Sequence, residues 1–205
     1  AADLGLFTIA VKEMSEDEDQ IPKIIGNILS LRTILVVATM LLAVALVFLL
    51  PNYQGTRVPI AVAIASITVF LTILNGTISS VLQTKLKMQV ASAASILGKV
   101  ISLAFMIYVV FWGFPNDTTT GFYMLMVAGV VGNFVMLIVT HHYVKKITPV
   151  TYRFDLDLWK DVLKKSLPYG IALILNTIYF RIDSILISLM RGQEEVGIYG
   201  VAMKM

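Results

Sequence analysis

The sequence contains no cysteine, which excludes disulfide bonds, thiolate metal sites and thiol redox chemistry. Charge is also scarce: Asp, Glu, Lys and Arg make up 14% of the 205 residues, whereas an ordinary soluble domain carries about 25%. Four long runs contain no charged residue at all, at positions 33–56, 58–84, 100–116 and 118–144. Because roughly 20 apolar residues cross the hydrocarbon core of a bilayer as a helix, each run predicts a membrane span.

Hydrophobic residues make up 58% of the chain, so the composition predicts an integral membrane protein with an all-α fold, a polytopic transmembrane helix bundle. We expect a partial span at 1–11, full spans near 28–50, 59–82, 92–112, 121–142 and 167–190, and a further span that begins near residue 196. The chain starts without a methionine and stops at Met205 inside an apolar segment. We therefore expect a fragment of a longer protein.

The basic residues of the predicted connections alternate along the chain. The first, third and fifth connections, at 12–27, 83–89 and 143–166, hold ten lysines and arginines, whereas the second, fourth and sixth hold only Arg57 and Arg191. Basic connections stay on the cytoplasmic side of a membrane. We therefore expect a multi-pass protein of the cell (cytoplasmic or inner) membrane, with its Lys-rich connections in the cytoplasm. Because these residues form no single basic patch, the lipid bilayer is an expected partner and nucleic acid is not.

The connection at 143–166 differs from the others because it contains an amphipathic helical pattern. Leu156, Trp159 and Val162 repeat at helical spacing opposite charged residues, which predicts a helix lying on the cytoplasmic interface. Asp155 or Asp157 can cap its start, and Pro168 suits the first turn of the span that follows. This linker divides the chain into a first bundle at 1–142 and the start of a second at 167–205.

The predicted span at 167–190 carries two opposite charges, Arg181 and Asp183, where each costs roughly 2.5 to 3.5 kcal/mol near the bilayer centre. Helical geometry places them on different stripes, with Asn176 and Tyr179 beside Asp183. An apolar arc from Ile171 to Leu189 should face lipid. The charges therefore predict either an ion pair in the bundle interior or a hydrated cavity.

Polar residues interrupt three other spans. Asn75 and Gln83 lie on one face of the span at 59–82 with Thr72, Gly76 and Ser79, where they either line a polar cavity or join helices through hydrogen bonds. Arg32 and Lys99 lie near the cytoplasmic ends of their spans, where their side chains either snorkel to the headgroups or enter a cavity. Small residues predict close helix packing: Ala91, Ser95, Gly98 and Ser102 in one span, and Ala128 and Gly132 in another.

The sequence offers little for enzyme chemistry. His141 and His142 are adjacent and accompany no HExxH motif or acidic cluster, so we interpret them as interfacial residues and not as metal ligands. No GxxxxGK[ST] motif is present to hold a nucleotide. We therefore expect no enzyme activity, no metal and no cofactor.

Three segments resemble the polysaccharide biosynthesis proteins, the O-antigen or lipid-linked oligosaccharide flippases of the multidrug/oligosaccharidyl-lipid/polysaccharide exporter superfamily. These segments are "ADLGLFTIAVKEMS" near the start, "SSVLQTKLKMQVASAASILGKVIS" at 79–102 and "LKKSLPYGIALILNTIYFRIDSILISLMRGQEEVGIYGVAMKM" at 163–205. The resemblance implies a partial two-lobe exporter fold, from the end of helix 2 to the start of helix 8. The implied function is flipping of a polyprenyl-diphosphate-linked oligosaccharide to the outer leaflet by alternating access.

The implied substrate assigns hypothetical roles to the intramembrane polar residues. Arg181, Arg32, Lys99 and Lys204 would offer positive charge to the diphosphate, and Asn75, Gln83, Asn176 and Tyr179 would contact sugar hydroxyls. Asp183 would either share this cavity or couple transport to a proton or sodium ion, as intramembrane carboxylates often do. Two alternatives stay open: a drug or cation antiporter of the same superfamily, and a non-transporting membrane scaffold or enzyme.

Overall fold

The computed structural model describes residues 5–49, 56, 58–113, 117–190 and 199–200, apart from the side chains of residues 118, 181, 184, 185, 188 and 189. Throughout these residues the regular structure is helical, which confirms the all-α prediction. The elements are α1 (Leu6–Glu16), the 3₁₀ turn η1 (Glu18–Gln20), α2 (Ile21–Leu49), α3 (Val58–Thr84), α4 (Met88–Tyr108), the π-helical turn η3 (Val109–Gly113), α5 (Thr118–Lys145) and α6 (Leu156–Met190).

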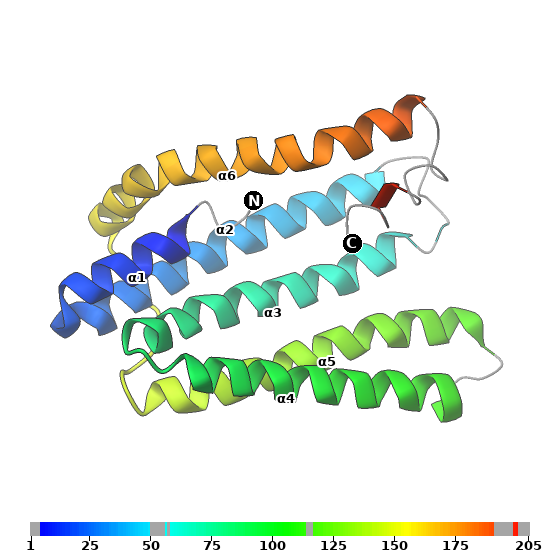
Figure 1. The fold of residues 1–205 in the computed structure, drawn as a ribbon, viewed down its shortest axis with the longest axis horizontal. Helices are drawn as coiled ribbons and strands as arrows, with labels where there is room; N and C mark the ends of the chain where they lie inside the picture. The colour runs from blue at the N-terminus through cyan, green and yellow to red at the C-terminus, as the bar shows by residue number, and fades with distance from the viewer. Residues whose placement is uncertain (1–4, 50–55, 57, 114–116, 191–198, 201–205) are drawn as a thin grey trace.

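The long helices run side by side in alternating directions (Figure 1). The central helix α3 packs against α2 on one side and α5 on the other, and α4 packs against α5. The short helix α1 lies between α2, α3 and the start of α6. As a result, α4 and α6 lie on opposite sides of the α2–α3 pair (Figure 1).

Four helical stretches are long and apolar enough to cross a membrane, at Glu18–Leu49, Val58–Thr84, Met88–Gly113 and Thr119–Lys145. They coincide with four of the predicted full spans, and the chain is a multi-pass membrane protein. Within the described part of the chain, α6 is not among these four. The crossing at 167–190 therefore stays a prediction.

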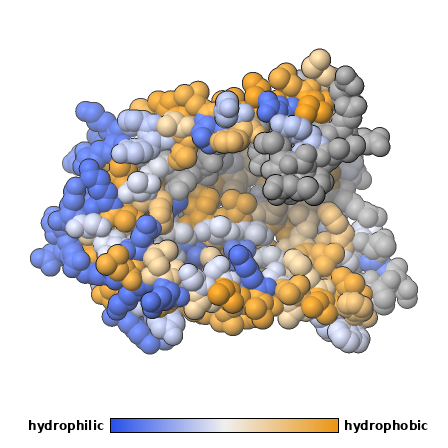
Figure 2. Space-filling view, viewed as in Figure 1, coloured by the Kyte–Doolittle hydropathy of each residue, from blue (hydrophilic) through white to orange (hydrophobic). Residues whose placement is uncertain are grey.

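Hydrophilic residues gather at one end of the molecule (Figure 2). This is the end at which α1 and η1 lead into α2, α3 turns into α4, and α5 leads to α6 (Figure 1), so it contains all three Lys-rich connections. Lys85 in the α3–α4 turn pairs with Glu18 of η1, and Lys165 of α6 pairs with Glu13 of α1 at 2.8 Å. The bonds to Asp161 and Glu13 raise the pKa of Lys165. The alternation of charge thus predicts which connections share an end.

Local sequence explains where several helices begin and end. The carboxylate of Asp117 accepts hydrogen bonds from the backbone N–H groups of Thr119 and Thr120 and so caps α5. Asp155 accepts a hydrogen bond from the N–H of Leu158 at 3.2 Å, which confirms its predicted capping of α6. Helix α3 ends with Leu86 in the left-handed conformation (φ 54°) and the N–H of Lys87 bonded to the carbonyl of Leu82, a pattern typical of a helix C-terminus.

The amphipathic segment and the following predicted span form one continuous helix, α6, with Pro168 inside it. The prediction that Pro168 begins a new helix is therefore wrong. Proline removes one intrahelical hydrogen bond, here the one to the carbonyl of Lys164. Both residues lie on exposed turns, where water can bond to that carbonyl. The first half of α6 also packs on α1 through a buried cluster that contains Leu6, Ile9, Leu31 and Val162, which holds the part of the helix that precedes the proline.

The connector at 146–155 runs along the start of α2 and bonds to it through its backbone. The N–H of Arg153 donates to the carbonyl of Gly26 at 3.3 Å and to the hydroxyl of Ser30 at 3.1 Å. The N–H of Asp155 donates to the side-chain oxygen of Asn27 at 2.7 Å. Asn27 and Ser30 are each 1% exposed. The predicted cytoplasmic linker is therefore fixed to the first span, and we call this contact the connector clamp.

The connector clamp should make stability depend on pH through Asp155. The N–H of Leu158 and the ammonium of Lys23, 3.1 Å away, hold the pKa of Asp155 below its usual range. A carboxylate with a lowered folded pKa stabilises the fold above the unfolded pKa, about 3.9, and this stability is lost as pH falls through the folded pKa. We expect Asp155→Asn to lower the thermal midpoint near neutral pH, with the difference from wild type shrinking at acidic pH.

Thermal unfolding in detergent across this pH range measures the effect. Asp157→Asn is the control, because that exposed residue lies in the same first turn of α6 but outside the clamp. An offset between Asp155→Asn and wild type that stays constant with pH would contradict the assignment.

Candidate functional site

The predicted polar residues of α6 lie on an exposed part of the helix. Residues 171–180 are all exposed, including Asn176, and the side chain of Tyr179 is 71% exposed. The predicted lipid-facing arc is exposed as well, at Ile171, Leu175, Ile178, Ile182 and Leu186. The structure places the backbone of Arg181 within α6, but the side chain of this residue is outside the described part. Exposure on both faces does not distinguish the proposed polar stripes from the proposed lipid-facing arc.

Asp183 has a partner that the sequence analysis missed. The hydroxyl of Tyr199 donates a hydrogen bond to the carboxylate of Asp183 at 3.1 Å. The two residues are 16 positions apart and belong to different segments, so helical periodicity within one span gave no signal. A tyrosine hydroxyl is a neutral hydrogen-bond donor, so this contact is not an ion pair.

Arg32 lies inside the bundle. It belongs to α2 and is 3% exposed, next in sequence to Leu31 of the buried cluster between α1, α2 and α6. Of the two alternatives that the sequence left open, snorkelling to the headgroups does not fit this burial. Helices α1 and α6 both contact α2, a packing that the sequence did not indicate.

The polar face of α3 joins two helices at one position and carries buried oxygens at two others. Thr72 donates a hydrogen bond to the side-chain oxygen of Asn133 on α5 at 3.0 Å, so it joins two helices. Asn75 is 5% exposed, and its side-chain oxygen is buried with no hydrogen-bond partner among the described residues; the same holds for the hydroxyl of Ser79. Gln83 is half-buried near the end of α3. Thus α3 combines an interhelical bond with unsatisfied buried oxygens.

Lys99 lies in a polar pocket between three of the membrane-spanning helices. The pocket has a volume of about 270 Å³ and no carboxylate among its lining residues. These are Thr72 of α3, Ser95, Gly98, Lys99 and Ser102 of α4, and Gly129, Gly132, Asn133 and Met136 of α5. We call it the Lys99 pocket.

A close crossing of α4 and α5 forms one wall of the Lys99 pocket. A Cβ atom placed on Gly98 would lie 2.6 Å from the carbonyl oxygen of Gly132, and one placed on Gly132 would lie 2.7 Å from the carbonyl oxygen of Gly98. The two backbones approach so closely that neither position has room for a side chain. The small-residue spacing of the sequence therefore marks a real helix crossing, as predicted.

The structure distributes the predicted site residues over several places. Lys99 lies on α4, on the far side of the α2–α3 pair from Asn176, Tyr179 and Asp183 of α6 (Figure 1). Lys204 lies outside the described residues. Asn133, which the sequence analysis missed, joins Lys99 in its pocket; the only signal was an amide side chain within a charge-free run. In the part of the chain that the structure describes, no group of three or more His, Asp or Glu side chains could hold a metal ion.

A family model described as "Polysaccharide biosynthesis protein" matches residues 2–205. The chain belongs to this family. Comparisons with curated proteins and with solved structures found no match. Membership in the family identifies a membrane protein of polysaccharide biosynthesis, of the flippase or exporter type.

In a polysaccharide biosynthesis protein, the Lys99 pocket offers groups suited to anions and hydroxyls. The ammonium of Lys99 has three N–H donors, and the hydroxyls of Thr72, Ser95 and Ser102 can both donate and accept. Lys99 and Thr72 are exposed, so an occupant can reach the ammonium and this hydroxyl without a rearrangement of the helices. The pocket can therefore bind a phosphate oxygen or a sugar hydroxyl within the membrane.

Proposed function

We propose that this polysaccharide biosynthesis protein moves a polyprenyl-diphosphate-linked oligosaccharide from the cytoplasmic to the outer leaflet of the cell membrane. The Lys99 pocket is the observation that carries the proposal. It combines an ammonium, three hydroxyls and an amide inside helices that are otherwise apolar, without a carboxylate among its lining residues. A diphosphate crossing hydrocarbon needs donors and positive charge, and this family acts in polysaccharide biosynthesis.

Lys99 is the first residue that we assign to the diphosphate, and Arg181, Arg32 and Lys204 are the further cations of the proposed path. Arg32 is buried in this conformation, so it would reach substrate only in another state of the transport cycle. Asn75, Gln83, Asn176 and Tyr179 are assigned to sugar hydroxyls. The buried, unpaired side-chain oxygen of Asn75 supports this role, because such an atom accepts a hydrogen bond from a hydroxyl at little cost.

Alternating access would move the first bundle at 1–142 against a second lobe that begins with α6. Helix α6 meets the bundle through its first half, at α1 and α2, whereas residues 171–180 are exposed. A contact confined to one end allows the rest of the helix to change its position relative to the bundle. The Lys-rich end would face the cytoplasm, and the proposed transport involves no covalent step and no cofactor.

Replacement of Lys99 tests the proposal. We expect Lys99→Gln to lower the initial rate of translocation about tenfold or more, because a hydrogen bond to a charged group contributes about 1.5–3 kcal/mol. Lys99→Arg should retain most of the rate, since it keeps the charge. The measurement follows a fluorescent lipid-linked oligosaccharide in proteoliposomes by its accessibility to an added lectin.

The control is Lys164→Gln, which removes an exposed charge from the first half of α6. Protein content and thermal midpoint are matched for all variants. Full translocation by Lys99→Gln at equal protein content would overturn the role of this pocket.

Asp183 favours a second candidate function, cation or drug antiport. Its carboxylate is exposed and bonded to a neutral hydroxyl, which is suited to binding a proton, a sodium ion or a cationic substrate. Efflux of a cationic dye that Asp183→Asn abolishes, with translocation of the lipid-linked oligosaccharide absent in wild type, would favour this alternative. Loss of oligosaccharide translocation in the same variant would instead assign Asp183 to the flipping cycle.

A further inference from the structure

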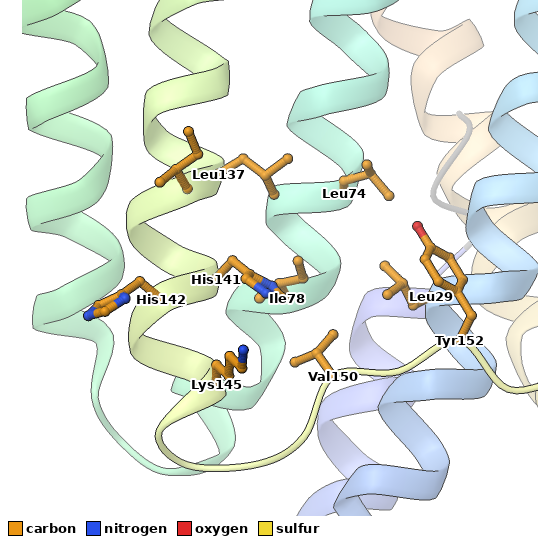
Figure 3. A pocket seen from close by; sticks show the side chains of 10 residues that line it. Leu29, Leu74, Ile78, Leu137, His141, His142, Lys145, Val150 and Tyr152 are labelled. Atoms are coloured by element: carbon orange, nitrogen blue, oxygen red, sulfur yellow. The ribbon is translucent and has the colours of Figure 1, made fainter.

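A second pocket lies at the Lys-rich end of the bundle and takes no part in the proposed transport (Figure 3). Its volume is about 490 Å³, within the size range of small-molecule sites. It is lined by Leu29 of α2, Leu74 and Ile78 of α3, Leu137, Ile138, His141, His142 and Lys145 of α5, and Val150 and Tyr152 of the connector. We call it the α5–connector pocket.

The lining of the α5–connector pocket is divided by chemistry. Leu74, Ile78 and Leu137 line it along the membrane-spanning parts of α3 and α5, and Lys145 lies beside the connector at the end of α5 (Figure 3). His141 and Lys145 are four residues apart on α5 and so share a face. The pocket therefore runs from an apolar part between the membrane-spanning helices to a basic mouth at the Lys-rich end of the bundle.

Charge at the mouth is of one sign. Lys145 contributes a full positive charge, and His141, which points into the pocket, contributes at least one N–H donor (Figure 3). The hydroxyl of Tyr152 points toward Leu74, farther inside (Figure 3). No aspartate or glutamate is among the lining residues. An occupant with an anionic head and an apolar chain matches both parts of the pocket.

We propose that the α5–connector pocket binds one anionic phospholipid of the adjoining leaflet, with its phosphate at Lys145 and His141 and the start of an acyl chain between Leu74, Ile78 and Leu137. Basic pockets between membrane helices bind the headgroups of anionic lipids by this combination of charge and apolar contact. The connector forms part of the wall through Val150 and Tyr152, so a bound lipid would link the connector to α3 and α5.

The volume favours a membrane phospholipid over the lipid-linked oligosaccharide. A volume of about 490 Å³ lies in the lower half of the range of small-molecule sites. That space fits a phosphate headgroup and the beginning of one chain, whereas a diphosphate with attached sugars and a polyprenyl chain is considerably larger. The residues assigned above to transport, including Lys99 and Asp183, do not line this pocket.

Lipid binding to the purified chain in a neutral detergent tests the proposal. Native mass spectrometry would compare phosphatidylglycerol with phosphatidylcholine of the same acyl chains. We expect selective retention of phosphatidylglycerol, and a dissociation constant about fivefold higher for Lys145→Gln, the effect of removing one basic residue near a membrane surface. Leu137→Trp, which fills the apolar part, should also weaken phosphatidylglycerol binding.

Lys146→Gln is the matched control. Lys146 is adjacent in sequence, but it lies over the ring of Tyr143 at 5.3 Å and is not a lining residue; its replacement should leave the dissociation constant unchanged. Lys99→Gln should also leave it unchanged, which separates this site from the proposed transport. The proposal is overturned if Lys145→Gln and Lys146→Gln weaken binding equally, or if Leu137→Trp binds phosphatidylglycerol as wild type does.

Two further probes identify the source of the phosphate. Inorganic phosphate that displaces phosphatidylglycerol at equal concentration would show a site for a free anion and not for a lipid. A polyprenyl diphosphate that binds more tightly than phosphatidylglycerol and loses affinity in Lys145→Gln would show a substrate site. Either result overturns the assignment to a membrane phospholipid.

Discussion

Replacing Gly132 with alanine is expected to destabilise the bundle by about 1–3 kcal/mol, the usual cost of overpacking a close contact. The added Cβ would lie 2.7 Å from the carbonyl oxygen of Gly98 and 2.7 Å from the Cβ of Ser102 on α4. The carbonyl belongs to the backbone of a membrane-spanning helix and has no alternative rotamer. Relief therefore requires the backbones of α4 and α5 to move apart at this crossing.

Helix propensity alone predicts the opposite effect on stability, so the comparison of two glycine positions separates packing from propensity. Alanine is favoured over glycine inside a helix by about 1 kcal/mol, so a glycine without a packing role should gain stability on the same substitution. Gly129 provides this comparison on the same helix. Its added Cβ would meet Thr68 at 3.7 Å, an ordinary van der Waals contact.

Unfolding in mixed micelles, monitored by circular dichroism, gives the free energy of unfolding of each variant. Gly132→Ala should be less stable than wild type and Gly129→Ala equally stable or more stable. Gly98→Ala should reproduce Gly132→Ala, because the two glycines face each other. Equal stabilities for Gly132→Ala and Gly129→Ala would show that the helices separate at no cost. This result would contradict the prediction that the close crossing stabilises the bundle.

Features that repeat within one segment were predictable from the sequence. Charge-free runs gave the four spans, small residues marked the crossing at Gly98 and Gly132, and Asp155 was identified as a cap. Each of these signals depends on residues within a few turns of one another. The alternation of basic connections also predicted which connections share one end of the bundle, since a membrane admits only two sides.

Contacts between distant segments were not predictable. Asn27 and Ser30 read as polar residues at the start of a span, and nothing nearby showed that the backbone of the connector more than 120 positions later would bond to them. The position of Arg32 near a span end left snorkelling and cavity entry as alternatives. Its burial follows from helix packing that the sequence does not show. Asn133 lines the Lys99 pocket because three helices meet there, and the sequence does not show which helices meet.

Pro168 shows a different limit, since local rules gave the wrong result there. Proline at the first turn of a helix is common, and the preceding segment is amphipathic while the following one is apolar, so the local pattern predicted a helix boundary. The helix continues because packing of its first half on α1 and the exposure of the affected turn compensate for a single missing hydrogen bond. Tertiary contacts outweighed the local preference.

Replacing Gly26 with alanine is expected to release the connector from α2, at a cost of about 2–3 kcal/mol. The added Cβ would clash with the carbonyl oxygen of Thr151 and lie 3.1 Å from the Cγ of Arg153. The connector must then move away, and the N–H of Arg153 loses the carbonyl of Gly26 and the hydroxyl of Ser30. Each buried polar group left without a partner costs about 1–3 kcal/mol.

Trypsin reports on this release, because cleavage after Arg153 requires local opening of the connector. Gly26→Ala should accelerate that cleavage, while Gly76→Ala should not, since a Cβ on Gly76 of α3 meets nothing within 4 Å. A double variant with Ser30→Ala should lose less than the sum of the single losses, because both substitutions break the same contact. Additive losses would mean that the two residues act separately.

Release of the connector should also affect the α5–connector pocket, because Val150 and Tyr152 belong to the segment that moves. Gly26→Ala is therefore expected to weaken phosphatidylglycerol binding although Gly26 does not line the pocket. Gly76→Ala serves again as the comparison. Faster tryptic cleavage with unchanged lipid affinity would show that the connector clamp and the pocket are independent, since the lipid would then bind to α3 and α5 without the connector.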